Sequence, residues 1–140
     1  MKYVFIENPI AGNKSRQMLF KQVQSAFRLI DDEMIIEETA YRGHAKQIAA
    51  DYAAKYGEEC VIVCCGGDGT LHHTVNGLLR LEQPPLLGYI PSGSTNDFAA
   101  SLGLPKTPED AADAVVNGRP HAIDAGDFGG ELFCLSLIHI

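Results

Sequence analysis

The chain has 140 residues, of which 46% are hydrophobic and 21% charged, and a formal net charge of −7. These values indicate one globular domain rather than a disordered chain, and the negative charge argues against nonspecific nucleic-acid binding, which needs clustered lysine and arginine. They do not exclude a phosphorylated ligand, because helix N-termini and a divalent metal can hold phosphates on an acidic protein.

Strand and helix patterns alternate along the chain. The predicted elements are, in order, a strand at 2–7, a helix at 15–30, a strand at 33–38, a helix at 43–56, a strand at 60–65, a helix at 70–81, a strand at 86–90, a short helix at 97–102, a helix at 107–116, and two further strands at 120–125 and 131–135. The run CVIVCC at 60–65 is apolar throughout, as expected of a strand buried on both faces. The alternation predicts an α/β domain, a layered parallel sheet with helices on both faces.

The cysteines indicate buried thiols. They stand at positions 60, 64, 65 and 134 without zinc-like spacing, and the adjacent Cys64 and Cys65 point to opposite faces of a strand. This usage is typical of a reducing cytosol. The N-terminus begins in a strand without the apolar region of a signal peptide, and no apolar run approaches transmembrane length, so we expect a cytoplasmic location.

Glycine-bearing turns follow three of the predicted strands. They read NPIAGNKS at 8–15, GGDGT at 66–70 and PSGSTND at 91–97. Ligands of parallel α/β sheets collect where strands end and helices begin. The glycines of GGDGT allow positive φ and close approach of a ligand, and the N–H groups at the start of the next helix suit a phosphate. Thr70 is expected either to cap that helix or to donate its hydroxyl to a phosphate oxygen.

Asp68 stands among these glycines. A carboxylate beside a phosphate is repelled unless a cation lies between them, and Mg²⁺ bridges hard oxygens in this way. The alternative is a tight turn in which Asp68 caps the next helix. A turn needs only one or two glycines, and a cap does not account for the other two glycine turns, so a metal–nucleotide site is the favoured interpretation.

Four segments resemble, in order and spacing, the nucleotide-binding half of the diacylglycerol-kinase-like family of bacterial lipid kinases. They are NPIAGNKS, GGDGTLHHTVNGLL, LGYIPSGSTNDFAASLGLP and AIDAGDF. NAD kinases also carry GGDGT, whereas the residues at 75–78 and 91–99 are more specific to lipid kinases. The resemblance implies a phosphofructokinase/NAD-kinase-like domain, ATP and Mg²⁺ as cofactors, and transfer of the γ-phosphate to a lipid hydroxyl, of diacylglycerol or a similar lipid, in phospholipid biosynthesis.

The resemblance also implies a set of site residues. The nucleotide-contacting positions are Asn8, Pro9, Gly12, Lys14, Thr39, Gly66, Gly67, Asp68, Gly69, Thr70, Gly93, Ser94, Thr95 and Asn96. Asp68, Asp97 and Asp124 match the acidic positions that organise Mg²⁺ in the family, and Asp68 is the expected catalytic residue.

Two departures from the family pattern concern side chains. His73 stands where the family usually has glutamate, and Ala100 stands where arginine is frequent. His72 and His73 are adjacent on a helix and point about 100° apart, so we expect them at the nucleotide edge or in solvent rather than on one metal ion. His44 and His121 are expected to be structural.

The end of the chain departs as well. Family members continue into a β-rich second domain, which helps to form the lipid site and supplies the catalytic base. The residues at 135–140, LSLIHI, match a translated sequencing-library adapter, so the expected division is a kinase domain at 1–134 and an adapter-derived end, the alternative being a natural apolar strand.

From this division we expect a fragment inactive by itself. The parent protein would meet its lipid at the inner membrane surface through the second domain, without nucleic acid and without a transmembrane segment, and a homodimer is left open. The other functions considered are an NAD kinase and a non-catalytic nucleotide-binding homologue.

Overall fold

The fold is given by a computed structural model that describes residues 1–9, 33–79, 81–91, 100, 103–105, 108–117, 120–122, 126–128, 131–133 and 137–139. Its elements are β1 (Lys2–Glu7), β2 (Glu33–Glu38), α2 (His44–Tyr56), a 3-10 turn η1 (Gly57–Glu59), β3 (Cys60–Gly66), α3 (Asp68–Leu78), β4 (Leu86–Pro91), α5 (Pro108–Asn117), β5 (Pro120–Ala122), β6 (Gly126–Phe128), β7 (Glu131–Phe133) and β8 (Leu137–His139). None of the helices in these ranges is both long and apolar enough to span a bilayer.

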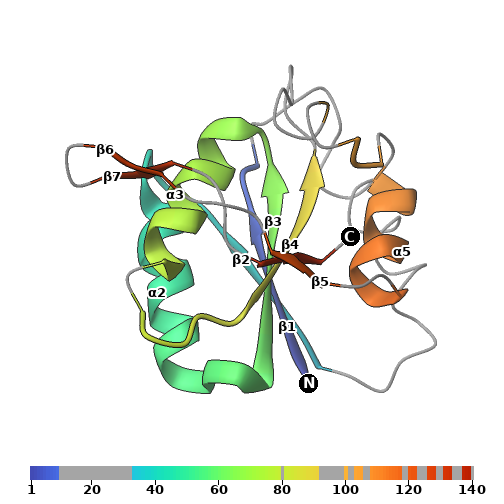
Figure 1. The fold of residues 1–140 in the computed structure, drawn as a ribbon, viewed down its shortest axis with the longest axis horizontal. Coiled ribbons are helices and arrows are strands. Elements are labelled where there is room, and N and C mark those ends of the chain that lie inside the picture. Colours follow the sequence, from blue (N-terminus) through green and yellow to red (C-terminus); the bar gives the residue numbers. More distant parts are fainter. Residues whose placement is uncertain are drawn as a thin grey trace.

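The main sheet has the strand order β2-β1-β3-β4-β8-β5. Strands β1 to β4 are parallel to one another, and β8 is parallel to β4. Strand β5 is antiparallel to β8, and β6 and β7 form a separate antiparallel pair. Helices α2 and α3 lie on one side of the sheet and α5 on the other (Figure 1). The predicted fold class, a layered parallel sheet with helices on both faces, is therefore confirmed.

Two apolar cores explain why the central strands carry so few polar residues. Val4 and Ile6 of β1 pack on the side of α2 and α3, whereas Tyr3 and Phe5 pack on the side of α5. Because successive strand residues point to opposite faces, a strand covered on both sides must be apolar throughout. All seven residues of β3 are accordingly buried.

Close helix packing depends on glycines at two contacts. A Cβ on Gly88 of β4 would stand 2.8 Å from a methyl carbon of Val115, so α5 lies almost directly on β4. A Cβ on Gly77 of α3 would clash with the carbonyl oxygen of Lys46 in α2. The absence of a side chain lets the Val115 side chain approach the main chain at Gly88, and lets the backbones of α2 and α3 approach each other at Gly77.

Most predicted elements of the first 120 residues agree with the structure. The strands at 2–7, 33–38, 60–65 and 86–90 and the helices at 43–56 and 107–116 are confirmed, each to within one residue at either end. Gly57 ends α2 with φ +55°, as its position predicted. The predicted helices at 15–30 and 97–102 fall largely or wholly outside the described residues.

The predicted bounds of α3 were wrong. The helix runs from Asp68 to Leu78 rather than from 70 to 81. It begins earlier because Gly67, in an extended conformation, is the N-cap, so that Asp68 already belongs to the first turn. It ends earlier because the N–H of Leu81 donates to the carbonyl oxygen of Leu78 in a tighter turn.

The C-terminal strands also differ from prediction. Within the described residues the expected strands at 120–125 and 131–135 correspond to β5 and β7, and β6 was not predicted. The segment assigned to an adapter contains β8, which pairs with β4 and β5. Backbone pairing does not depend on the origin of the residues, so the adapter interpretation stays a prediction.

Candidate functional site

The loops after three parallel strands are joined at one edge of the sheet. The N–H of Asn8, after β1, donates to the carbonyl oxygen of Cys65 at 3.3 Å, and the N–H of Thr39, after β2, donates to that of Glu7 at 2.9 Å. The strands end level with one another, because Glu7 pairs in register with both Glu38 and Cys65. The predicted meeting of strand ends is confirmed for the ends of β1 and β3, to which the structure adds β2, while the predicted turn at 91–97 lies largely outside the described residues.

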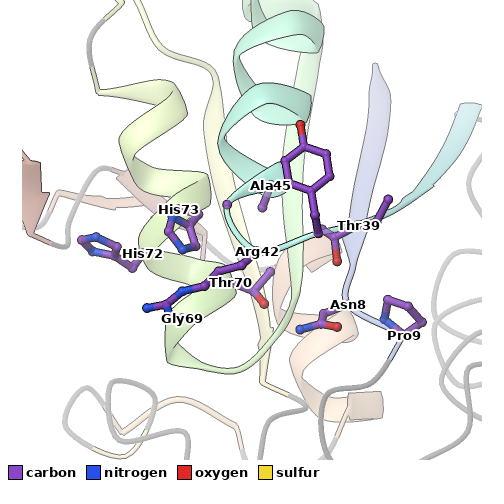
Figure 2. A pocket seen from close by; sticks show the side chains of 12 residues that line it. Asn8, Pro9, Thr39, Arg42, Ala45, Gly69, Thr70, His72 and His73 are labelled. Carbon is purple, nitrogen blue, oxygen red and sulfur yellow. The ribbon is translucent and has the colours of Figure 1, made fainter.

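A cavity of about 690 Å³ opens at this edge. Figure 2 shows its lining, in which Asn8 and Thr70 face the same space. The lining residues are Asn8, Pro9, Thr39, Ala40, Tyr41, Arg42, Gly43, Ala45, Gly69, Thr70, His72 and His73. Five of the predicted site residues, Asn8, Pro9, Thr39, Gly69 and Thr70, therefore line one cavity of a size typical for small-molecule and cofactor sites.

The glycine loop is built differently from expectation. The positive φ values among the described glycines belong to Gly43, Gly57 and Gly103, so Gly66, Gly67 and Gly69 do not use the positive φ that glycine allows. Gly66 is required instead because a Cβ there would stand 2.8 Å from Thr70 Oγ1. At Gly69 a Cβ would meet nothing within 4 Å, so the main chain is open toward the cavity.

Asp68 occupies the first turn of α3. Neither Asp68 nor Thr70 is the cap that two of the sequence hypotheses proposed, because Gly67 holds that position without a side-chain cap bond. Asp68 is half-buried and, like Gly66 and Gly67, adjoins the cavity lining without forming part of it. The helix start therefore presents first-turn N–H groups, the helix dipole and one carboxylate within three residues.

The cavity also contains a cation that the sequence interpretation did not assign. Arg42 reaches from the loop after β2 toward the start of α3, near His72 and Gly69 (Figure 2). Its position in the segment YRGHA gave only a weak signal, since an arginine in a loop between a strand and a helix is usually solvent-exposed, and Arg42 is exposed here while lining the cavity. In a chain of net charge −7, a guanidinium at a helix N-terminus favours an anionic ligand.

The loop that carries Arg42 is ordered by His44. The N–H of Ala40 donates to Nδ1 of His44 at 2.9 Å, and the imidazole stacks on Tyr41 with ring centroids 4.4 Å apart. Gly43, with φ +87°, turns the chain into α2. The predicted structural role of His44 is confirmed by these contacts.

His72 and His73 both line the cavity, and their expected place at the nucleotide edge or in solvent stays a prediction. Their ring centroids lie 5.4 Å apart with the planes at 66°, and Asn76 donates from Nδ2 to the carbonyl oxygen of His72 at 2.9 Å. Within the described ranges no cluster of three or more His, Cys, Asp or Glu side chains could hold a metal ion.

The thiols of β3 lie in the core behind the site. Cys60, Cys64 and Cys65 are free and buried, as predicted. Burial raises the pKa of the Cys64 thiol to about 12, and a hydrogen bond with Thr74 lowers this pKa by a smaller amount. Burial also raises the pKa of the Cys65 thiol well above its ordinary value. Such thiols are inert rather than nucleophilic.

The remaining predicted site residues lie outside the described ranges. They are Gly12, Lys14, Gly93, Ser94, Thr95, Asn96, Asp97 and Asp124. Their assigned roles stay predictions.

Comparison with known proteins gives one consistent result. A family model described as the diacylglycerol kinase catalytic domain matches residues 2–128. A diacylglycerol kinase of Bacillus subtilis is 40% identical over 131 residues, which cover 91% of this chain and 42% of that protein. Sphingosine kinase 1 of Arabidopsis thaliana is 34% identical over 134 residues, which cover 88% and 27%.

Solved structures agree with the sequence matches. A crystal structure of a diacylglycerol kinase from Bacillus anthracis superimposes with a TM-score of 0.80 at 30% identity, covering 94% of this chain and 47% of that one. The chain spans less than half the length of each of these relatives.

Proposed function

Because this chain belongs to the diacylglycerol kinase catalytic-domain family, we propose that it is the nucleotide-binding part of an ATP-dependent lipid kinase. The complete protein transfers the γ-phosphate of ATP to a hydroxyl of diacylglycerol or a similar lipid. The observation that carries the proposal is the convergence of Asn8, Thr39 and the start of α3 on one cavity.

ATP lies with its phosphates at the start of α3 and its nucleoside in the cavity. The N–H groups of the first turn and the hydroxyl of Thr70 meet phosphate oxygens, and Arg42 adds a positive charge near Gly69. The polar groups of Asn8 and Thr39 orient the nucleoside. Lys14 and the loop at 93–96, at positions outside the described ranges, extend the same contacts.

Magnesium fits the residues at the start of α3. Mg²⁺ is commonly held by one or two carboxylates together with substrate phosphates, and Asp68 offers such a carboxylate beside the open main chain of Gly69. Asp97 and Asp124 are the further proposed ligands. When bound, the ion neutralises charge on the phosphates.

The chain supplies only part of what the reaction needs. Phosphoryl transfer depends on positioning and charge stabilisation, so a protein with the nucleotide site but without the lipid site and the base has little activity. Both come from the part of the complete protein beyond this chain, which meets its lipid at the inner membrane surface.

The test is an acceptor competition with the complete protein. Labelled γ-phosphate of ATP is offered together with diacylglycerol in mixed micelles and NAD in solution. Label in the lipid product supports the proposal, whereas label in NADP establishes an NAD kinase instead.

His73 favours a second candidate, a non-catalytic nucleotide-binding homologue. An imidazole lines the cavity where the family usually has a carboxylate. Binding of ATP by the complete protein without transfer to any lipid establishes this candidate. Restoring the carboxylate in a His73→Glu variant then tests whether the imidazole is the cause.

A further inference from the structure

Consecutive carbonyl groups of the glycine loop are each held by a different element. The oxygen of Cys65 accepts from the N–H of Asn8, and the oxygen of Gly67 accepts from the N–H of Leu71 at 3.1 Å. Between them, the oxygen of Gly66 accepts from the hydroxyl of Tyr89 at 3.1 Å. Two of these donors are backbone groups and one is a side chain.

Tyr89 comes from the middle of β4. It pairs in register with Cys64, is only 3% exposed, and lies in the core on the side of α2 and α3. Its hydroxyl reaches past its own partner residue to the end of β3. A leucine or isoleucine would fill the same core without placing a polar atom there, so packing alone does not account for a tyrosine.

The bond to Gly66 fixes the direction of a peptide plane. A trans peptide is planar, with its C=O and N–H on opposite sides, so holding the oxygen of Gly66 toward Tyr89 turns the N–H of Gly67 the other way. In the same manner, the bond from Leu71 to Gly67 directs the N–H of Asp68 out of the helix start. The amide of Asp68 belongs to the first turn, which the proposed function assigns to phosphate binding, and the amide of Gly67 directly precedes it.

Glycines make such an external support necessary. Gly66, Gly67 and Gly69 leave the loop with more accessible backbone conformations than any other residues would. Without the Tyr89 hydroxyl, the carbonyl oxygen of Gly66 would lose this hydrogen bond. The Gly66–Gly67 peptide would then rotate to let the oxygen accept a hydrogen bond from water.

We infer that Tyr89 is a positioning residue for the nucleotide, whose buried hydroxyl holds the Gly66–Gly67 peptide with its amide toward the phosphates. This inference rests on the proposed function. It assigns to β4 a role in phosphate affinity and none in binding of the nucleoside, because the nucleoside contacts come from the loops after β1 and β2.

The test uses Tyr89→Phe, which removes one oxygen atom and keeps the ring. Calorimetric titrations of this chain with ATP and with adenosine, in the presence of Mg²⁺, compare the variant with the unsubstituted protein. The affinity for ATP falls about tenfold, the size expected from one lost hydrogen bond, while that for adenosine stays within about twofold.

Tyr52→Phe is the matched control. The hydroxyl of Tyr52 donates to Oε1 of Glu37 at 2.5 Å, at the edge of the sheet formed by β2. The control also loses one tyrosine hydroxyl bond, and it leaves the ATP affinity unchanged. Melting temperatures of both variants keep a loss of stability separate from a loss of affinity.

The outcomes separate the inference from the proposed function. No ATP binding by the unsubstituted chain overturns the proposed function and the role of Tyr89 together. ATP binding that Tyr89→Phe leaves unchanged, or that weakens for adenosine and ATP alike, overturns the role of Tyr89 alone.

Discussion

Asp68 is the residue on which the proposed chemistry depends most. It stands in the first turn of α3, where its charge also interacts favourably with the helix dipole. In the complete enzyme, Asp68→Asn keeps the shape of the side chain and removes the charge. We predict a loss of transfer rate of about 100-fold or more, and a loss of stability of only about 0.5 kcal/mol.

Steady-state kinetics and chemical denaturation measure the two effects. Asp51→Asn is the control, because Asp51 is exposed on α2 and accepts a hydrogen bond from Gln47 away from the cavity. If Asp68→Asn transfers phosphate at the unsubstituted rate, the carboxylate of Asp68 has no role in the reaction.

Gly69 tests the requirement for an open main chain. A Cβ at this position meets no atom within 4 Å, and the residue lines the cavity. We therefore predict that Gly69→Ala raises stability by about 0.5 kcal/mol, as alanine does in a helix, while the methyl group weakens ATP binding about tenfold. Unchanged ATP affinity would place the phosphates elsewhere.

The buried thiols predict how stability depends on pH. An unfolded cysteine ionises near its ordinary value of 9.0, whereas folded Cys64 keeps its proton up to about 12. The unfolded chain thus releases protons that the folded chain retains, so this stabilisation is complete below about pH 9 and is lost as pH rises toward the folded pKa.

Urea denaturation from about pH 8 to about pH 10 measures the effect. The free energy of unfolding falls across this range, and Cys64→Ala reduces the slope. The pKa of Tyr52, raised to about 12 by its hydrogen bond to Glu37, acts in the same direction from about pH 10 upward. A flat profile from pH 8 to 10 would contradict the burial of ionisable thiols.

Single residues divide into those that sequence reasoning found and those that it missed. Asn8 and Gly69 stand in recognisable glycine turns, and strand ends of a parallel sheet share one edge, so their meeting followed from the pattern. Thr39 was expected there only from the family resemblance. Tyr89 gave no such signal, because a tyrosine in an apolar strand looks like any core residue. Its role depends on a side chain long enough to reach from β4 to the carbonyl oxygen of Gly66 at the end of β3.

At the scale of elements, the contact between α2 and α3 fixes the distance between two helices that both contribute residues to the cavity. Gly77 of α3 lies against the carbonyl oxygen of Lys46 and against Ala49, leaving no room for a Cβ. We predict that Gly77→Ala forces the helices apart and lowers the free energy of unfolding by about 2 kcal/mol, despite the higher helix propensity of alanine.

Gly69→Ala, the same substitution in the same helix, is the matched control for stability. Urea denaturation of both variants makes the comparison. Equal or higher stability of Gly77→Ala would contradict the close packing of the two helices.

Elements of regular pattern were predictable and their ends were not. The alternation of apolar strands with amphipathic helices is a local property, so β1 to β4, α2 and α5 appear where expected. The start of α3 depends on the extended conformation of Gly67. A run with glycines at 66, 67 and 69 does not indicate which of them is extended and caps the helix. The short strands β5 to β8 pair across distant segments and have no local signature.

At the scale of the whole molecule, helices cover both faces of the sheet, and a cavity lined by described residues opens at its carboxyl edge. The two cores account for the apolar strands, and the loops are held at the open edge by main-chain bonds such as that from Thr39 to Glu7. The sequence and its family resemblance were enough to anticipate this arrangement. They did not place Tyr41 and Arg42 in the cavity, because that depends on how the loop after β2 turns at Gly43.

The account as a whole requires that phosphates bind where α3 begins. Amide chemical-shift mapping by NMR, with Mg²⁺–ATP and then adenosine added to this chain, tests that location directly. We predict that ATP causes its largest shifts at Gly67, Asp68, Gly69 and Thr70, and that adenosine shifts Asn8 and Thr39 but not these four. Shifts that cluster away from this edge, or no shifts with either ligand, would contradict the account.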